Sequence, residues 1–362
     1  MASRAGRGLM NGVPPQASTV LDRRPLPALV LSWPSTRALI AVLALFLVSP
    51  LIAIGSVGPT AIVSMLPFAA LTAIIAVGQT LVIQQGGLDL SIPGAVTLAA
   101  FIAAKFGSDP AIGLPLAVVI AVLGTTLFGV LSGVVIAVFG LPPLVVTIAS
   151  NALLVGAVYA VSGGFAAQAP EALSDFALDR VGGVPVLAVI AVVLVIVVQA
   201  VLKLTRLGRR FELVGENPRS AEVIGIPVKA YVISAYGLAT FLAAIGGVLL
   251  AGLLRQPILT AGNVYLLPSI AAVVLGGTAL TGGRGSLVGT ALGALFLAQL
   301  SQLVQTFTQA TAVQNIVQAL IIGVGIVAQL QLGGSSARLR GLVQRRATQP
   351  NSSPDDSTRS VQ

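Results

Sequence analysis

The chain has no cysteine and no histidine among its 362 residues, and only 9% of them carry a charge. The absence of both residue types excludes the common zinc sites, thiol nucleophiles and Ser-His-Asp triads. Lys105, Lys203 and Lys229 do not follow a glycine, so the Gly-Lys-Ser/Thr core of a P-loop is missing. The chain therefore cannot bind ATP through a P-loop of its own.

The low charge also separates this chain from soluble domains, of which roughly 25% is charged. Hydrophobic residues make up 56% of the sequence, and the mean hydropathy is +0.99. Uncharged stretches recur at the length of about 20 residues that a helix needs to cross a bilayer. Within these stretches, apolar and polar residues do not alternate as they would in the strands of ~10 residues of a membrane β-barrel. The sequence predicts an all-α, polytopic bundle of transmembrane helices.

About ten spans are predicted, and glycine and proline clusters separate several of them. The predicted spans are 38–54, 61–83, 90–104, 111–139, 143–161, 184–202, 230–254, 264–280, 287–306 and 312–332. The third and the eighth are short for a full crossing. Residues 37–332 thus form the membrane domain. Residues 1–36 and 333–362 are polar and are predicted to be disordered cytosolic ends.

The distribution of cations predicts the orientation. With the N-terminus in the cytosol, only Lys105, Arg180 and Arg255 of the 20 Lys and Arg residues fall on the outer side. This bias agrees with the positive-inside rule, and about ten spans then place the C-terminus in the cytosol too. Cationic flanks beside anionic lipid account for the net charge of +9, so no nucleic-acid partner is implied.

A charged island, VGENPRSAEVIGIP (214–227), interrupts the apolar runs inside the largest predicted cytosolic loop, 203–229. Asn217 suits the N-cap of a short helix, Pro218 its first position, and Gly225 the left-handed residue after its end. A helix of about two turns is marginal in water and needs a packing partner.

The island has two interpretations. One is a capped connector on the membrane surface, and the other is a docking helix for a soluble protein. Ala221 and Ile224 are three residues apart and are expected to share a face that docks against such a partner.

Three stretches of sequence resemble a known family. They are GQTLVI with GGLDLS (78–83 and 86–91); Gly208-Arg209 with Gly215, Asn217, Ala221 and Gly225-Ile226; and IAAVVLGGT (270–278) with GGRG (282–285) and Gly289-Thr290. By these stretches the chain is similar to the membrane subunit of bacterial ABC importers of the ribose and monosaccharide branch, which are related to branched-chain amino-acid permeases. The GGRG segment by itself is typical of a tight turn between spans.

The resemblance implies a multi-pass subunit of the bacterial inner membrane with no catalytic residue, metal or cofactor of its own. Two permease copies, identical or different, would form the pore. A separate ABC ATPase subunit would bind ATP and Mg²⁺, and a periplasmic or lipid-anchored binding protein would deliver the solute. The island would then be the coupling segment that contacts the ATPase, with these residues: Gly215, Glu216, Asn217, Arg219, Ala221, Glu222 and Gly225.

Asp89 is the only charged residue between Arg37 and Lys105. A carboxylate at the bilayer centre costs ~2.5–3.5 kcal/mol on insertion scales, so Asp89 should lie near an interface or hold a partner. Three roles stay open: a cap of the third span together with Ser91 and Pro93, a gate at the inner mouth, or direct contact with the solute.

Polar side chains within the spans are candidates for the translocation path, because a polyol is bound by amides and hydroxyls. These are Gln79, Thr80, Asn151, Ser234 and Thr240. Each of them could instead form a hydrogen bond between neighbouring helices.

The sequence favours the permease subunit of an ATP-driven importer for a small polar solute, with a monosaccharide first. Two departures from the family pattern, Tyr265–Pro268 and Ile92-Pro93, bear on the choice of solute. A nucleoside or branched-chain amino-acid permease is the alternative within the same class. A self-contained secondary transporter or channel would need acids or histidines within the membrane for ion coupling, or a pore ring. Asp89 alone is weak support for this class. A scaffold that moves no solute would leave the capped island unexplained.

Overall fold

A computed structural model describes residues 34–307 together with residues 310, 312, 313, 316, 319, 320, 323 and 324. Most of the predicted span 312–332 lies outside these residues. The predicted disordered end 333–362 lies wholly outside them, as do the first 33 residues of the predicted segment 1–36.

Seven helices of the described chain are long and apolar enough to cross a membrane. They are α2 (Pro34–Ile52), α3 (Pro59–Gln84), α5 (Gly113–Phe139), α6 (Pro143–Ser162), α8 (Val186–Leu204), α11 (Val228–Leu254) and α13 (Leu287–Gln305). Two shorter apolar helices match the two short predicted spans: α4 (Ile92–Gly107), and η1 with α12 (Asn263–Tyr265 and Leu266–Leu275). The helical fold is confirmed, and nine predicted spans coincide with helices.

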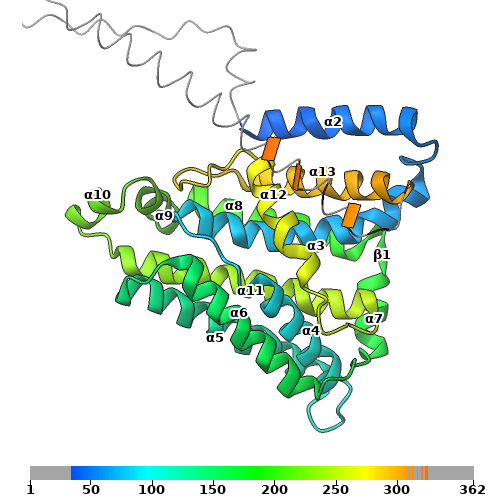
Figure 1. The fold of residues 1–362 in the computed structure, drawn as a ribbon, viewed down its shortest axis with the longest axis horizontal. Helices are drawn as coiled ribbons and strands as arrows, with labels where there is room; N and C mark the ends of the chain where they lie inside the picture. The colour runs from blue at the N-terminus through cyan, green and yellow to red at the C-terminus, as the bar shows by residue number, and fades with distance from the viewer. Residues whose placement is uncertain are drawn as a thin grey trace, which may run out of the picture.

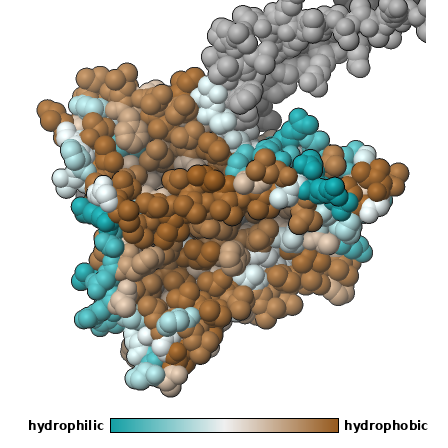
Figure 2. Space-filling model, turned by 180° about the vertical axis from the view of Figure 1, so that it is seen from behind, coloured by the Kyte–Doolittle hydropathy of each residue, from teal (hydrophilic) through white to brown (hydrophobic). Residues whose placement is uncertain are grey.

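The remaining elements are short and lie at the two ends of the bundle (Figure 1). Helices α9 (Arg206–Glu216) and α10 (Pro218–Val223) form one end, called here the α10 end. Helix α7 (Glu171–Leu178) and the antiparallel pair β1 (Arg180–Val181) and β2 (Val184–Pro185) mark the opposite end, the α7 end. In Figure 2 a broad hydrophobic band separates hydrophilic residues at the two ends, as a bilayer requires.

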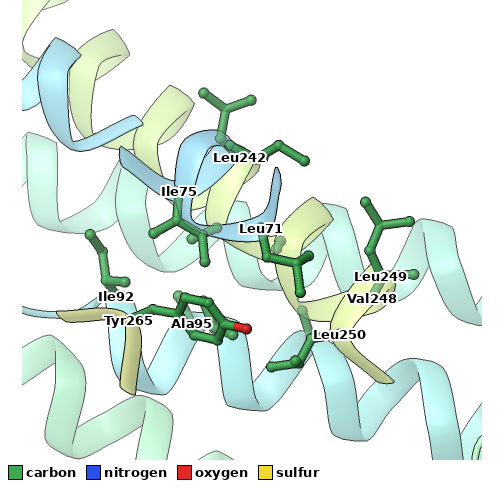
Figure 3. Packing of buried hydrophobic residues seen from close by; sticks show 14 of the residues in the cluster. Leu71, Ile75, Ile92, Ala95, Leu242, Val248, Leu249, Leu250 and Tyr265 are labelled. Atoms are coloured by element: carbon green, nitrogen blue, oxygen red, sulfur yellow. The ribbon is translucent and has the colours of Figure 1, made fainter. Parts of the chain in front are cut away.

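Helices α3, α4 and α11 form the core, and small residues let them approach closely. A Cβ added at Gly247 of α11 would lie 2.3 Å from the carbonyl oxygen of Val96 in α4. Leu71 and Ile75 of α3 and Leu250 of α11 belong to the same buried cluster (Figure 3). Within lipid there is no hydrophobic driving force between apolar helices, so the close packing of small residues holds them together.

Helix α4 begins inside the protein. The linker 85–91 carries the chain from the α10 end of α3 to Ile92, and every α4 residue from Ile92 to Ala104 is buried. Non-helical backbone at membrane depth is tolerated only where protein or a water-filled cavity covers it. The short third span thus follows from a helix that starts below the surface of the bundle.

Candidate functional site

The C-terminal end of α3 contacts the loop that carries the charged island. A Cβ added at Gly215 in α9 would lie 2.3 Å from the carbonyl oxygen of Gln84. One turn earlier, the carbonyl of Phe211 accepts a hydrogen bond of 2.9 Å from the side-chain amide of Gln85. Glycine at position 215 therefore brings the backbones of α9 and α3 into direct contact.

The turn between α12 and α13 reaches the same point. The backbone N–H of Gly283 donates to the carbonyl of Gln84 over 3.0 Å, and the Arg284 guanidinium forms an ion pair with the Glu216 carboxylate. Gly282 and Gly283 have φ of +90° and +98°, which confirms the predicted tight turn.

Residues 84–86, 215–216 and 282–285 are therefore in contact, and they are called the junction below. One segment comes from each of the three stretches that carry the family resemblance. The first and third stretches also meet deeper in the bundle, where the hydroxyls of Thr80 and Thr290 lie 2.9 Å apart.

Gln84 occupies the centre of the junction. Its side chain is fully buried, and neither amide atom has a hydrogen-bond partner in the described chain. A Cβ added at Gly285 would lie 2.5 Å from the Gln84 amide nitrogen, so the turn closes directly over this side chain. Buried amides without partners are rare in folded proteins, and they often mark a place that moves or binds something.

Helix α10 has the predicted caps. The Asn217 side chain accepts from the backbone N–H of Ser220 over 3.0 Å, and Pro218 opens the helix. Gly225 follows its end with a φ of +77°, in the left-handed region. Both features limit α10 to less than two turns, as the sequence predicts.

The predicted docking face of α10 is wrong. Ala221 is 2% exposed and packs with Val214 and Ile226, whereas Ile224 is 67% exposed. The helix ends at Val223, and its single inward position is used to anchor it to α9. The outward surface of the island instead carries these exposed side chains: Arg219, Glu222, Val223 and Ile224.

The candidate coupling residues thus divide into two groups. Gly215 and Glu216 face the junction, and Ala221 anchors α10. Asn217, Arg219, Glu222 and Gly225 are exposed at the α10 end. Arg284 and Gln84 were not among the predicted residues. The only signal for them was the resemblance: Arg284 lies within the third stretch, and Gln84 lies between the two parts of the first.

Asp89 lies in the linker between α3 and α4 and is 1% exposed. One carboxylate oxygen accepts from the backbone N–H and the hydroxyl of Ser91, at 2.8 and 2.5 Å, and the other has no partner in the described chain. Asp89 therefore orders the turn that enters α4. Ser91 holds the N-cap position, but no side chain caps the helix.

Four of the five predicted path residues have hydrogen-bond partners within the protein. Thr80 contacts Thr290, and Asn151 accepts from the backbone N–H of Gly94 over 2.9 Å, which ties α6 to α4. The hydroxyls of Ser234 and Thr240 donate to backbone carbonyls of their own helix. Gln79 is different. It is fully buried, and both its amide atoms lack a partner in the described chain.

A cavity of about 440 Å³ opens between α3, η1, α12 and α13, in the half of the bundle toward the α7 end. Its polar lining residues are Ser64, Thr72, Tyr265, Ser301, Gln302 and Gln305. Gln79 follows Thr72 by seven residues, nearly two turns, so both lie on one face of α3. Gln79 does not line the cavity, but it lies on the face of α3 that does, nearly two turns closer to the α10 end.

Comparison with known proteins assigns most of the chain to one family. A family model described as branched-chain amino acid transport system / permease component matches residues 61–326. That range includes the cavity, the junction and the island. No solved structure matches the chain.

Curated proteins with similar sequences are import permeases. The ribose import permease protein RbsC of Haemophilus influenzae is 34% identical over 280 residues, which are 75% of this chain and 85% of that protein. RbsC of Bacillus subtilis is 30% identical over 74% of this chain and 84% of its own. The autoinducer 2 import system permease protein LsrD of Escherichia coli is 32% identical over 72% and 82%.

Proposed function

The chain belongs to the family of branched-chain amino acid transport system permease components, and from that premise we propose that it forms the translocation path for a monosaccharide or a similar small polar solute. It is the permease component of an ABC importer in the bacterial inner membrane. Such a component is a transport subunit without catalytic activity, and ATP is bound by a separate ATPase.

The cavity lining supports a neutral, hydroxyl-rich solute. It offers hydroxyl and amide side chains and contains no Asp, Glu, Lys or Arg. An amino acid carries an ammonium and a carboxylate, and burying either without a charged or well-placed polar partner is unfavourable. The relatives also support such a solute, since they are named as import permeases for ribose or autoinducer 2. A branched-chain amino acid or a nucleoside remains the alternative solute for the uptake assay.

The α10 end faces the cytosol in this proposal, as do both termini. The distribution of Lys and Arg supports this orientation. The ATPase then meets the exposed surface of α10, where Val223 is 88% exposed beside the charged Arg219 and Glu222. A binding protein delivers solute at the α7 end, and a second permease copy completes the pore.

The junction supports a route by which the ATPase opens the path. Helix α10 is anchored to α9 through Ala221, and α9 touches α3 through Gly215 and the turn 282–285 through Glu216. A displacement of the island is thus passed directly to α3 and α13, two of the helices that line the cavity. The observation that carries the proposal is this contact of all three stretches at Gln84.

Uptake by the reconstituted importer tests the function. The chain is placed in liposomes with its ATPase and its binding protein, and uptake of labelled ribose is measured with and without ATP. We expect accumulation only when ATP and the ATPase are both present. Uphill uptake by the chain alone, driven by a proton or sodium gradient, would contradict the proposal. Uptake of leucine or a nucleoside, but not of ribose, would change only the solute.

The Glu216–Arg284 ion pair provides a separate prediction. Glu216→Arg places two cations together at the junction, and we expect ATP-driven uptake to fall about tenfold. The double variant Glu216→Arg with Arg284→Glu restores the attraction and should recover most of the loss. Because both side chains are partly exposed, at 35% and 81%, the pair itself contributes only ~0.2–1 kcal/mol to stability. Equal uptake in the single and double variants would show that the pair does not transmit motion.

A further inference from the structure

A second cavity of about 480 Å³ lies at the α10 end, between α8, α9, α11 and the end of α3. Its walls are almost wholly apolar, and they include Leu81, Val198, Leu202, Phe211 and Leu238. The volume falls within the range of about 300–1,000 Å³ that is typical of small-ligand pockets.

The groove opens on the surface of the bundle. Val201, Leu207 and Leu238 line it and are 45%, 64% and 46% exposed. All three are aliphatic, and they belong to α8, α9 and α11. An aliphatic opening of this kind, beside two apolar spanning helices, faces hydrocarbon rather than water.

Cationic side chains flank the opening. Arg206, Arg209 and Arg210 are exposed, and Arg210 lines the groove itself. None of the three guanidinium groups has a hydrogen bond or ion pair within the described part of the chain. The two acids of α9 do not neutralise them, because Glu212 pairs with Lys203 and Glu216 pairs with Arg284.

Helix α9 has the pattern of a helix that lies in the membrane interface. Leu207, Phe211 and Val214 recur at spacings of four and three and form its apolar face. The arginines fall between them and form its cationic face. Such a helix places its basic side chains at the level of the lipid headgroups while its apolar face packs below them.

We propose that this groove binds one anionic phospholipid, with an acyl chain between α8 and α11 and the headgroup phosphate on Arg210. Charge complementarity identifies the occupant. A neutral acyl chain gains little by moving from bilayer to groove, since both are hydrocarbon, so selectivity comes from the unpaired guanidinium. The inner surface of a membrane attracts basic segments through its anionic lipids. The proposal rests on the cytosolic placement of α9 and is independent of the solute.

Native mass spectrometry of the purified full chain tests this directly. Phosphatidylglycerol and phosphatidylethanolamine with identical acyl chains are added at equal concentration, and retained lipid is counted. We expect phosphatidylglycerol to be retained in preference, with one molecule bound most tightly per chain. Arg210→Gln should weaken this retention about fivefold, and Leu238→Trp, which fills the groove, should weaken retention of both lipids.

Two matched variants provide the controls. Arg180→Gln removes an exposed cation at the α7 end, and Leu123→Trp adds the same bulk at an exposed position of α5 outside the groove. Neither should alter retention. Equal retention of the two lipids by the unchanged chain would overturn the proposal, as would an equal loss with Arg180→Gln and Arg210→Gln. A change in the number of chains per complex with Leu238→Trp, at constant lipid count, would assign the groove to a protein contact and also overturn it. These readouts need no transport, so they are separate from the uptake test.

Discussion

Gly215→Ala is expected to lower ATP-driven uptake by a factor of ten or more while the chain still inserts and assembles with its ATPase. The added Cβ would lie 2.3 Å from the carbonyl oxygen of Gln84, far inside van der Waals contact. The obstructing atom is backbone, so no side-chain rotation relieves the overlap. The same carbonyl accepts the hydrogen bond from Gly283, and a shift of α9 would therefore separate the turn 282–285 from α3.

An unobstructed glycine provides a control that separates the steric overlap from helix propensity. Alanine is favoured over glycine within a helix by ~1 kcal/mol, so on propensity alone Gly215→Ala should stabilise α9. Gly124 lies within α5 with no atom within 4 Å of an added Cβ, and Gly124→Ala should leave uptake unchanged. Uptake and ATPase activity are measured for both variants in the same liposomes.

The two activities distinguish a broken junction from a broken protein. We expect Gly215→Ala to retain ATP hydrolysis while solute uptake falls, because the ATPase still binds the outward surface of α10. Normal uptake by Gly215→Ala would show that the α9–α3 contact is not the route of coupling. Loss of the Gly215→Ala protein from the membrane would instead show a folding defect. We would then expect no second substitution to a smaller residue elsewhere in the chain to restore the protein, because the obstructing atom is backbone.

The helices could be predicted from the sequence because hydropathy and length alone determine what crosses a bilayer. Glycine, proline and asparagine at positions 217–225 also act locally, so the limits of α10 were predictable. The direction in which its side chains face was not. Ala221 and Ile224 are three residues apart, yet one is buried and the other is exposed. With less than two turns of helix, contact with Val214 and Ile226 determines the face, and those contacts depend on tertiary packing.

The junction could not be derived from residue chemistry, because its members are distant in sequence. Glu216 and Arg284 are separated by 68 residues. Thr80 and Thr290, which meet deeper in the bundle, are separated by 210. Only the family resemblance placed these stretches in one functional unit, and it gave no contacts between them. Polar residues within the spans were ambiguous for a related reason. The hydroxyl of a threonine such as Thr240 donates its hydrogen bond to a carbonyl of its own helix. Nothing in the sequence distinguishes such a threonine from one that binds the solute.

Gln79 is the path candidate whose removal should separate function from stability most clearly. If Gln79 serves only to hold helices together, Gln79→Leu should destabilise the protein. Its two amide atoms have no partner in the described chain, however, and a buried polar group left unpaired costs ~1–3 kcal/mol. Leucine of similar size removes that cost, so we expect the melting temperature in detergent to rise.

Uptake should change in the opposite direction. In the proposed path the Gln79 amide, two turns inward from the cavity at Thr72, forms hydrogen bonds with the solute only as it passes. Losing them should lower kcat/KM for uptake about tenfold, the equivalent of ~1.4 kcal/mol. Gln299→Leu provides the contrast. That glutamine is equally buried, but only its amide oxygen lacks a partner, because its amide nitrogen donates to the carbonyl of Ser56 over 3.4 Å. Gln299→Leu loses one hydrogen bond along with one unpaired oxygen, so it should raise the melting temperature less than Gln79→Leu and spare uptake. A Gln79→Leu protein that melts at a lower temperature and transports normally would remove Gln79 from the path. A polar group that binds the passing solute must lower the stability of the empty protein and favour binding of the solute.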